Sequence, residues 1–264
     1  MRTLIIQSYR THNVASWISD CMHSVRAWAD ERSYEYEFVD DHLFDYAPGW
    51  VRQLCGAKIL PITDVARMYL LREYLQRGWD RVVWVDADVL VFASQKFVLD
   101  DAAPYSLCRE LSVYVNPERE VRFDEMVNNA VLLVTPRQPM LDFWIFAVEE
   151  ILRDSVPDEI DSLTAGTRFF TNVAMAMPVR VLQNIGLFTP PLIRDIAAGG
   201  GALLEQWVAR FGRPIGAANL CASMQDREYS GARVGAADMQ RAVEVLLNTR
   251  GELVNRWTNL TLTA

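Results

Sequence analysis

Short apolar runs alternate with segments of helical periodicity along the first third of the chain. Residues 3–8 form a short apolar run, which predicts a buried strand. Residues 34–38 alternate between aromatic and acidic side chains, which predicts a second strand. Between these strands apolar residues recur every three or four positions and predict an amphipathic helix; they are Val14, Trp17, Ile18, Cys21, Val25 and Trp28.

A second helix and a third strand follow. Thr63 and Asp64 are typical of a helix start, and Gly78 marks the helix end. The apolar stripe of this helix comprises Val65, Met68, Tyr69 and Leu75. Residues 81–85 form an apolar run that is too short for a helix and rich in β-branched side chains, as in a strand covered on both faces of a parallel sheet. The first third is therefore predicted to be βαβ-like.

The remaining pattern predicts further strands and helices in one domain. The strands are expected over residues 126–134 and 179–182, and the helices over residues 140–152, 167–177 and 238–247. Glycines 199–201 predict a plain loop after a helix end, with a mobile lid as the alternative. No repeat or convincing linker divides the 264 residues. We expect a single Rossmann-like α/β/α sandwich with a mixed, mostly parallel central sheet.

Composition and charge narrow the classes of partner. The formal net charge of -8 disfavours a nucleic-acid partner, because phosphate backbones bind clustered Lys and Arg. Cys21, Cys55, Cys108 and Cys221 lack metal-ligand spacing, so we expect buried free thiols and neither zinc nor disulfides. No signal-peptide core follows Arg2, and no apolar run reaches membrane-spanning length. We expect a cytoplasmic protein without a membrane span, and peripheral membrane contact is left open.

Two carboxylates stand at the carboxyl end of the third predicted strand. Asp86 and Asp88 follow an apolar run and precede another, at the edge where open α/β sheets bind ligands. A turn there can direct both acids toward one hard cation, Mn²⁺ or Mg²⁺, which prefers oxygen ligands and would relieve their repulsion. In the alternative interpretation, Asp86 caps a loop and Asp88 is solvated.

Upstream, Asp64 and Arg67 lie three residues apart and share one face of the predicted helix near its N-terminus. Backbone N–H groups at a helix N-terminus favour anions. Arg67 is therefore a candidate to bind a phosphate or sugar oxygen, and Asp64 a candidate to accept from sugar hydroxyls. The alternative is a surface ion pair of little energetic weight.

Residues 63–67 (Thr-Asp-Val-Ala-Arg) followed by residues 85–88 (Val-Asp-Ala-Asp) resemble the donor-site block of retaining GT-A glycosyltransferases. The similarity is to the family thirty-two type and the clostridial glucosylating toxins. It implies that Asp64 and Arg67 bind the donor sugar and diphosphate and that Asp86 and Asp88 bind ribose and metal. Trp84 stands where such enzymes often carry an aromatic residue near the nucleotide, although core packing is equally open.

The resemblance implies a hexosyltransferase that moves a sugar from a nucleotide sugar, with UDP favoured, to an acceptor hydroxyl with retention of configuration. Mn²⁺ or Mg²⁺ is the implied cofactor, and the acceptor, whether glycan, lipid-linked or protein, is not identified. Asp86, Asp88 and Arg67 are the predicted catalytic residues. Residues 1–135 form the predicted nucleotide-sugar half and residues 136–264 the acceptor half. We also place Gln7, Ser8 and Ala87 among the donor-binding residues.

Two weaker similarities follow. Residues 127–134 resemble the strand after Asp-x-Asp in family eight enzymes, which implies that Asn128 or Asn129 contacts the transferred sugar; a turn is the alternative. Residues 164–167 (Thr-Ala-Gly-Thr) with Thr171 resemble a Thr-Gly-Pro segment of family thirty-two, and a helix cap would give the same signal.

The chain also departs from the related enzymes, which commonly supply a third metal ligand near the C-terminus from His or Ser. All three histidines lie in the first fifth of the chain. Asn219, Ser223 and Asp226 are the candidates, and we name Asn219 as a ligand beside Asp86 and Asp88.

Two other functions are compatible with Asp86 and Asp88 at the end of this strand. A haloacid-dehalogenase phosphatase would use Asp86 as a nucleophile, although its motif normally opens the domain. A catalytically silent nucleotide-sugar-binding protein would bind the donor without turnover. An inverting transferase would also need a carboxylate base, for which Asp161, Asp226 and Glu228 are the candidates.

Overall fold

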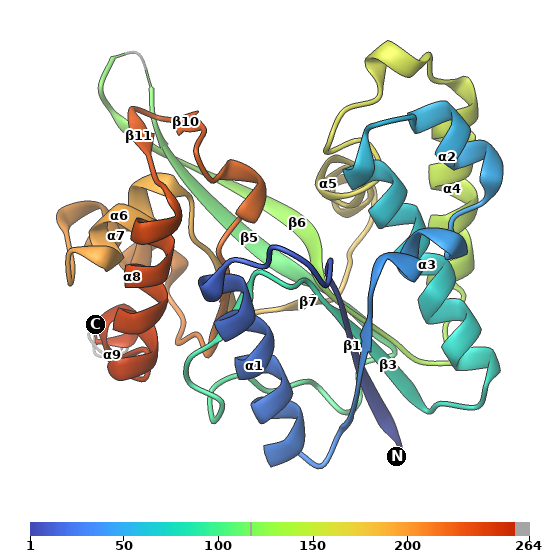
Figure 1. The fold of residues 1–264 in the computed structure, drawn as a ribbon, viewed down its shortest axis with the longest axis horizontal. Helices are drawn as coiled ribbons and strands as arrows, with labels where there is room; N and C mark the ends of the chain where they lie inside the picture. Colours follow the sequence, from blue (N-terminus) through green and yellow to red (C-terminus); the bar gives the residue numbers. More distant parts are fainter. Residues whose placement is uncertain (117, 257–264) are drawn as a thin grey trace.

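A computed structural model describes residues 1–116 and 118–256. Its centre is a six-stranded sheet in the order β2-β1-β3-β6-β5-β7 (Figure 1). The strands are β1 (Thr3–Ser8), β2 (Glu35–Val39), β3 (Arg81–Val85), β5 (Tyr105–Val115), β6 (Val121–Val134) and β7 (Val181–Leu182). β1 runs parallel to β2 and β3, and β5 runs parallel to β7, whereas β6 is antiparallel to both β3 and β5. The sheet is mixed and mostly parallel, as the sequence predicts.

Helices cover both faces of this sheet (Figure 1). On one face, Ile5 and Val83 pack in one buried cluster with Trp28 of α1 (Ser16–Glu31). On the other, Leu4 and Trp84 pack with residues of α3 (Ile59–Gln76) and α4 (Met140–Asp154). All five residues of β3 are buried, because adjacent side chains point to opposite faces and both faces are covered. The predicted α/β/α sandwich is confirmed.

The C-terminal third packs against the long β5–β6 hairpin. A second sheet has the order β4-β9-β8, from β4 (Val89–Val91), β9 (Ala217–Asn219) and β8 (Ile185–Leu187), and β10 (Glu228–Tyr229) pairs with β11 (Ala232–Arg233). The helices of this region are α6 (Pro190–Ala197), α7 (Ala202–Phe211), α8 (Ala236–Asn248) and α9 (Glu252–Asn255). Leu111 and Val113 of β5 share a buried cluster with Trp207 and Met239 of these helices. The β4-β9-β8 sheet joins the segment after β3 to residues 185–219.

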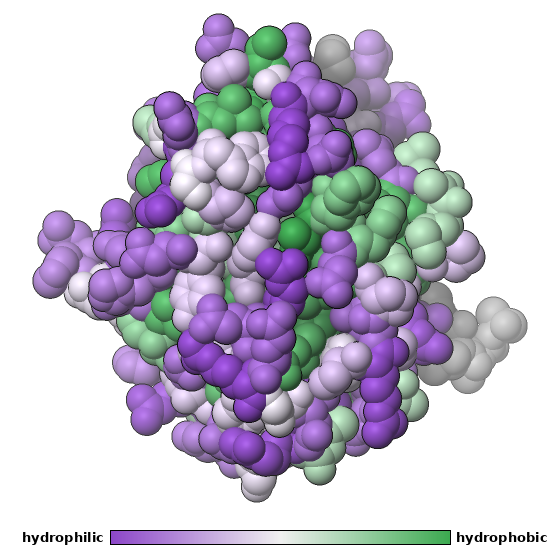
Figure 2. Space-filling view, turned by 90° about the vertical axis from the view of Figure 1, so that its right-hand side faces the viewer, coloured by the Kyte–Doolittle hydropathy of each residue, from purple (hydrophilic) through white to green (hydrophobic). Residues whose placement is uncertain are grey.

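Two further helices and three short 3-10 turns complete the described chain. The helices are α2 (Gly49–Cys55) and α5 (Thr167–Ala176), and the 3-10 turns are Asp41–Tyr46, Pro157–Glu159 and Ala222–Met224. Figure 2 shows the face that carries α2, α3 and α4, where hydrophobic side chains lie in patches among hydrophilic ones. Phe143 and Phe146 of α4 are among the exposed large hydrophobic residues. The apolar stripe of α4 is therefore wider than its buried face.

The start of α3 corrects one prediction. The helix begins at Ile59, one turn before Thr63, and Thr63 Oγ1 donates to the Ile59 carbonyl inside it. Pro61 does not prevent this start, because the first-turn N–H groups of a helix have no intrahelical partner. Asp64 and Arg67 therefore lie in the second and third turns, and the expected anion site at a helix N-terminus beside them is wrong.

The other predicted elements are found with small shifts in their bounds. The strand over residues 126–134 is the second part of β6, which begins at Val121. Glycines 199–201 form the link between α6 and α7, and Gly200 adopts a φ of 136°, which favours glycine. All four cysteines are free and buried. Over residues 1–116 and 118–256, no helix is long and apolar enough to cross a bilayer.

Candidate active site

A cavity of about 460 Å³ opens at the carboxyl ends of β1 and β3. Both predicted halves of the chain contribute to its walls. The polar lining includes Ser8, Asp64, Arg67, Asp86, Asp88, Glu110, Asn128, Asn129, Thr167, Asn219, Cys221 and Ser223, and Trp84 and Ala87 also line it. Polar groups gathered in one concave site make this cavity the first candidate for ligand binding.

Asp86 and Asp88 lie in a tight turn between β3 and β4. The Val89 N–H donates to the Asp86 carbonyl over 3.1 Å, which closes the turn. The Leu220 N–H donates to the Asp88 carbonyl over 3.0 Å, and the Ala222 N–H donates to Asp88 Oδ2 over 2.7 Å. A segment more than 130 residues later in the chain thus holds Asp88, and both carboxylates line the cavity. Asp88 is half-buried, and two backbone N–H groups hold it in place at the cavity.

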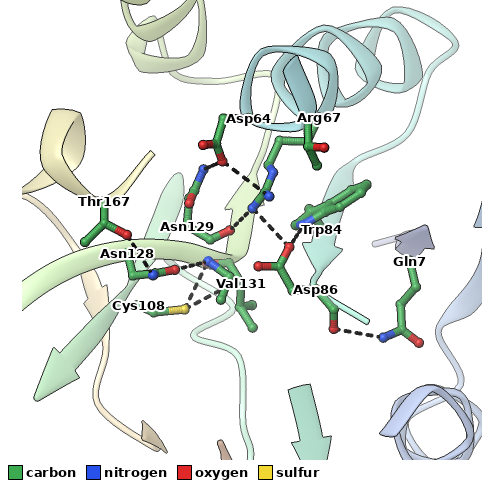
Figure 3. Close-up of polar contacts among 12 residues, drawn as sticks. Gln7, Asp64, Arg67, Trp84, Asp86, Cys108, Asn128, Asn129, Val131 and Thr167 are labelled. Carbon is green, nitrogen blue, oxygen red and sulfur yellow. Dashed lines mark hydrogen bonds and ion pairs between the residues drawn. The ribbon is translucent and has the colours of Figure 1, made fainter. Parts of the chain in front are cut away.

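Arg67 connects the two acidic positions beneath the cavity (Figure 3). Its Nη2 lies 3.3 Å from Asp64 Oδ1. Its Nη1 lies 3.0 Å from Asp86 Oδ1 and donates to the Asn129 carbonyl over 2.9 Å. Arg67 is 5% exposed and Asp64 is 6% exposed. The alternative of a surface ion pair is therefore wrong, because the pair is buried and shared with the strand-end acid.

Trp84 and Asn129 complete this buried network. Trp84 Nε1 donates to Asp86 Oδ1 over 2.6 Å, and the Arg67 guanidinium lies 5.0 Å from the Trp84 ring centre. Asn129 Nδ2 donates to Asp64 Oδ1 over 3.0 Å. Trp84 is only 1% exposed, so its ring packs in the core and its N–H orients Asp86. Asp86 Oδ2 forms no hydrogen bond or ion pair with another described residue.

The segment over residues 164–167 lies directly against the network. A Cβ atom on Gly166 would stand 2.5 Å from Asp64 Oδ2, so only glycine lets the chain pass this close to the carboxylate. Thr167 begins α5, and its Oγ1 accepts from Asn128 Nδ2 over 3.0 Å. Thr171 Oγ1 accepts from the Val127 N–H over 3.1 Å. The weak Thr-Gly-Thr similarity thus falls on residues that contact the cavity wall.

Glu110 is a cavity residue that the sequence analysis missed. It lies on β5, is 7% exposed, and its Oε2 accepts from Asn128 Nδ2 over 3.1 Å. A signal existed, because Arg109 and Glu110 are the only charged residues in residues 105–115, which are rich in aromatic and β-branched side chains. The strand itself was not predicted, so no face could be assigned to the acid.

Burial dominates the electrostatics of these acids. Burial raises the pKa of Asp64 to about 6, although the Arg67 charge and the Asn129 hydrogen bond oppose it. Burial also raises the pKa values of Asp86 and Asp88, and the Asp86 charge adds to the rise at Asp88. Burial raises the pKa of Glu110 to about 7, opposed by its hydrogen bond with Asn128. Burial thus disfavours the charged forms of these acids, and a cation bound beside them would favour those forms.

The remaining predicted residues take different positions. Gln7 is fully buried, and its Nε2 donates to the Asp86 carbonyl over 3.2 Å, so it supports the turn from one side (Figure 3). Ser8 lines the cavity and donates to the Asp40 carbonyl. Asn219 lines it from β9, with its Oδ1 accepting from the Cys221 N–H. Ala87 lies in the turn between the two acids.

The three carboxylates proposed as a general base lie elsewhere. Asp161 is paired with Arg168, and Asp226 and Glu228 are exposed. None of the three is part of the cavity lining. Ser223 does line the cavity, unlike Asp226. Two carboxylates outside the predicted donor block line the cavity, exposed Asp41 and buried Glu110.

The donor set fits a hard divalent cation. Asp86 Oδ2 and Asp88 Oδ1 accept no hydrogen bond from another described residue, and Asn219 Oδ1 keeps a second lone pair. Within residues 1–116 and 118–256, no group of three His, Cys, Asp or Glu side chains could hold a metal ion. Two carboxylates completed by an amide, water and phosphate oxygens suit Mg²⁺ or Mn²⁺, which keep sites open for substrate.

Comparisons with known proteins do not assign a family or an activity to this chain. Neither the protein-family models nor the curated proteins contain a match. Similar solved structures include a glycosyltransferase involved in the glycosylation of the major capsid of PBCV-1, which has a TM-score of 0.49, 11% identity and coverage of 91% of this chain and 98% of that chain. Another is A197 from STIV, with a TM-score of 0.29, 15% identity and coverage of 69% and 80%. At these TM-scores neither likeness assigns a family or an activity, so function is inferred from the site.

Proposed function

We propose that the protein is a GT-A-like glycosyltransferase that moves a sugar from a nucleotide-sugar donor, with UDP favoured, to an acceptor hydroxyl. The observation that carries this proposal is the turn of Asp86 and Asp88, joined through Arg67 to Asp64 and Asn129 in one cavity. Each acid of the turn keeps one oxygen directed to no other described side chain. This arrangement supports binding of a cation and a diphosphate together.

The polar residues of the cavity would have distinct roles in the transfer. Asp86 and Asp88 would hold the divalent cation, with Asn219 as a further oxygen ligand. A bound cation offsets the charge that develops on a departing nucleoside diphosphate. Arg67 fixes the orientation of Asp86 and favours the ionised form of Asp64. Asp64 would accept hydrogen bonds from sugar hydroxyls, and Asn128 or Asn129 would contact the transferred sugar. Arg67 and Asp64 are buried, which strengthens the interaction between their charges.

A ligand screen tests donor and metal together. UDP-glucose with Mn²⁺ should raise the melting temperature, since ligand at ~100 Kd adds about 2.7 kcal/mol and each kcal/mol shifts Tm by roughly 2–4 °C at this size. Mn²⁺ alone or UDP-glucose in chelator should give a much smaller shift. Release of free glucose or UDP on long incubation identifies an enzyme, whereas binding without release identifies a silent binding protein. Release of phosphate from a phosphomonoester, with no response to nucleotide sugars, would instead identify a phosphatase.

We further propose that the donor configuration is retained in the product. The support is the similarity of the Asp64–Arg67 and Asp86–Asp88 block to retaining enzymes, and the positions of Asp161, Asp226 and Glu228 outside the cavity lining agree with it. An α-linked donor should therefore yield an α-glycoside in the first-formed product, read by proton NMR from the anomeric coupling. A β product would defeat the assignment and would point to a carboxylate general base.

A further inference from the structure

Glu110 differs from Asp64, Asp86 and Asp88, the other carboxylates in the cavity wall that are not exposed. Asp64 and Asp86 share the Arg67 guanidinium, and Asp88 accepts a backbone N–H. Glu110 receives one hydrogen bond, from the neutral amide of Asn128, and forms no ion pair with a described residue. Its Oε1 has no hydrogen-bond partner in the described chain, although the side chain is more than nine-tenths buried.

A buried carboxylate of this kind lowers the free energy of unfolding. A buried carboxylate without a cation loses its hydration and gains little in return, and its raised pKa is the signature of that loss. A glutamine at this position would keep the acceptor oxygen for Asn128 without the charge. A charged group that weakens the fold and faces a cavity is typical of a functional site.

The strand order places Glu110 where the transferred sugar would lie. The Asp86 N–H donates to the Ala130 carbonyl of β6, and Asn128, two residues earlier on the same strand, contacts Glu110 on β5. β3 and β5 lie on either side of β6, so about 10 Å, or two strand spacings, separate their backbones. A donor with its diphosphate at the Asp86–Asp88 turn would extend its sugar across β6, past Asn128, toward Glu110.

We propose that Glu110 faces the transferred sugar as a catalytic carboxylate and stabilises the positive charge that develops at its anomeric carbon. This inference rests on the proposed function. In the transfer, the bond from the anomeric carbon to the phosphate oxygen breaks and its electron pair leaves with the diphosphate. The acceptor oxygen forms the new bond to the same carbon, and its proton passes to the departing phosphate. A fixed negative charge within the cavity lowers the energy of the intervening positive state.

Asn128 acts in this arrangement as the positioning residue. Its Nδ2 donates both to Glu110 Oε2 and to Thr167 Oγ1, so the amide is held from the side of α5 and in turn fixes the carboxylate. One Glu110 oxygen is thereby committed to the wall and the other is available to a ligand. A substitution that keeps the Asn128 hydrogen bond isolates the effect of the charge.

Glu110→Gln tests the proposal through activity and stability together. The kcat for transfer should fall by about 10²-fold or more, as for loss of one electrostatic contact to a transition state, while the KM for the donor changes little. The melting temperature at pH 8 should rise by roughly 5 °C, because a buried unpaired charge is removed. Glu110→Asp, which keeps the charge but shortens the side chain, should retain more activity than Glu110→Gln.

Glu125→Gln is the matched control, since Glu125 lies on the adjacent strand, is exposed and pairs with Arg109. Its kcat and melting temperature should stay close to those of the parent protein. An active parent with an equally active Glu110→Gln variant would overturn the inference alone. A Glu110→Gln variant that loses activity and melting temperature together would assign Glu110 to structure and also overturn it. A parent that neither binds nor turns over any nucleotide sugar would overturn the proposed function and this inference with it.

Discussion

Asp88→Asn is expected to lower sugar transfer by about 10³-fold or more, the scale of losing a preorganised charge contact in a catalytic site. Asp88 lines the cavity, its Oδ2 accepts from the Ala222 N–H, and its Oδ1 accepts no hydrogen bond from another described residue. Asparagine can keep the first contact with its own oxygen. Its amide nitrogen replaces the second oxygen, and an N–H group cannot bind a cation. The variant should also lose the Mn²⁺-dependent shift in melting temperature with UDP-glucose.

The fold of the Asp88→Asn variant should remain intact, because the side chains match in shape and the backbone contact survives. Asp226→Asn is the matched control, since Asp226 lies seven residues after Asn219 but outside the cavity lining. It should keep both activity and the metal response. Full turnover by Asp88→Asn, or by the parent protein in excess chelator, would remove the cation from the mechanism.

Arg67→Ala is expected to have the largest effect on stability. Its removal leaves Asp64 and Asp86 without their shared cation, and breaking a buried ion pair in this way typically costs about 3–5 kcal/mol. Arg72 is one turn further along α3, with a partly exposed side chain 3.6 Å from exposed Asp142, so Arg72→Ala should cost under ~1 kcal/mol. Urea unfolding of the two variants measures the difference directly.

Arg67→Lys separates charge from geometry in the same experiment. Lysine keeps a cation near Asp64 but cannot span Asp64, Asp86 and the Asn129 carbonyl with one planar group. We expect intermediate stability and weakened donor binding at a temperature where the variant is folded. If Arg67→Ala and Arg72→Ala were equally stable and bound donor equally well, the buried network would have no role in the fold or the site.

Local periodicity accounts for most of the elements that the sequence predicts. Residues 81–85 form the predicted strand because an apolar run rich in β-branched side chains suits burial on two faces. The helix over residues 140–152 appears as α4 because its apolar stripe meets the sheet. The start of α3 was misplaced because Pro61 is compatible with either a loop or a first helical turn, and the local pattern does not choose between them.

The Asp86–Asp88 turn and its partner Arg67 were also readable from the sequence, since acids after a buried strand and an i,i+3 pair on a helix are local signals. Burial of the Asp64–Arg67 pair could not be predicted from the sequence, because it depends on Asn129 and Gly166, which approach Asp64 from other elements.

The position of Glu110 in the cavity and the contact of Asp88 with the Ala222 N–H arise from the tertiary structure alone. Glu110 enters the site because β5 and β6 form an antiparallel pair next to β3, and Asp88 is fixed because β9 pairs with β4 more than 120 residues away along the chain. Local sequence was sufficient to predict β1, β2, β3, the second part of β6 and several helices, and to place two acids at the end of β3. Strand order and register place distant residues beside those acids. Long-range strand pairing depends on the packing of the whole chain, so it cannot be predicted from local periodicity.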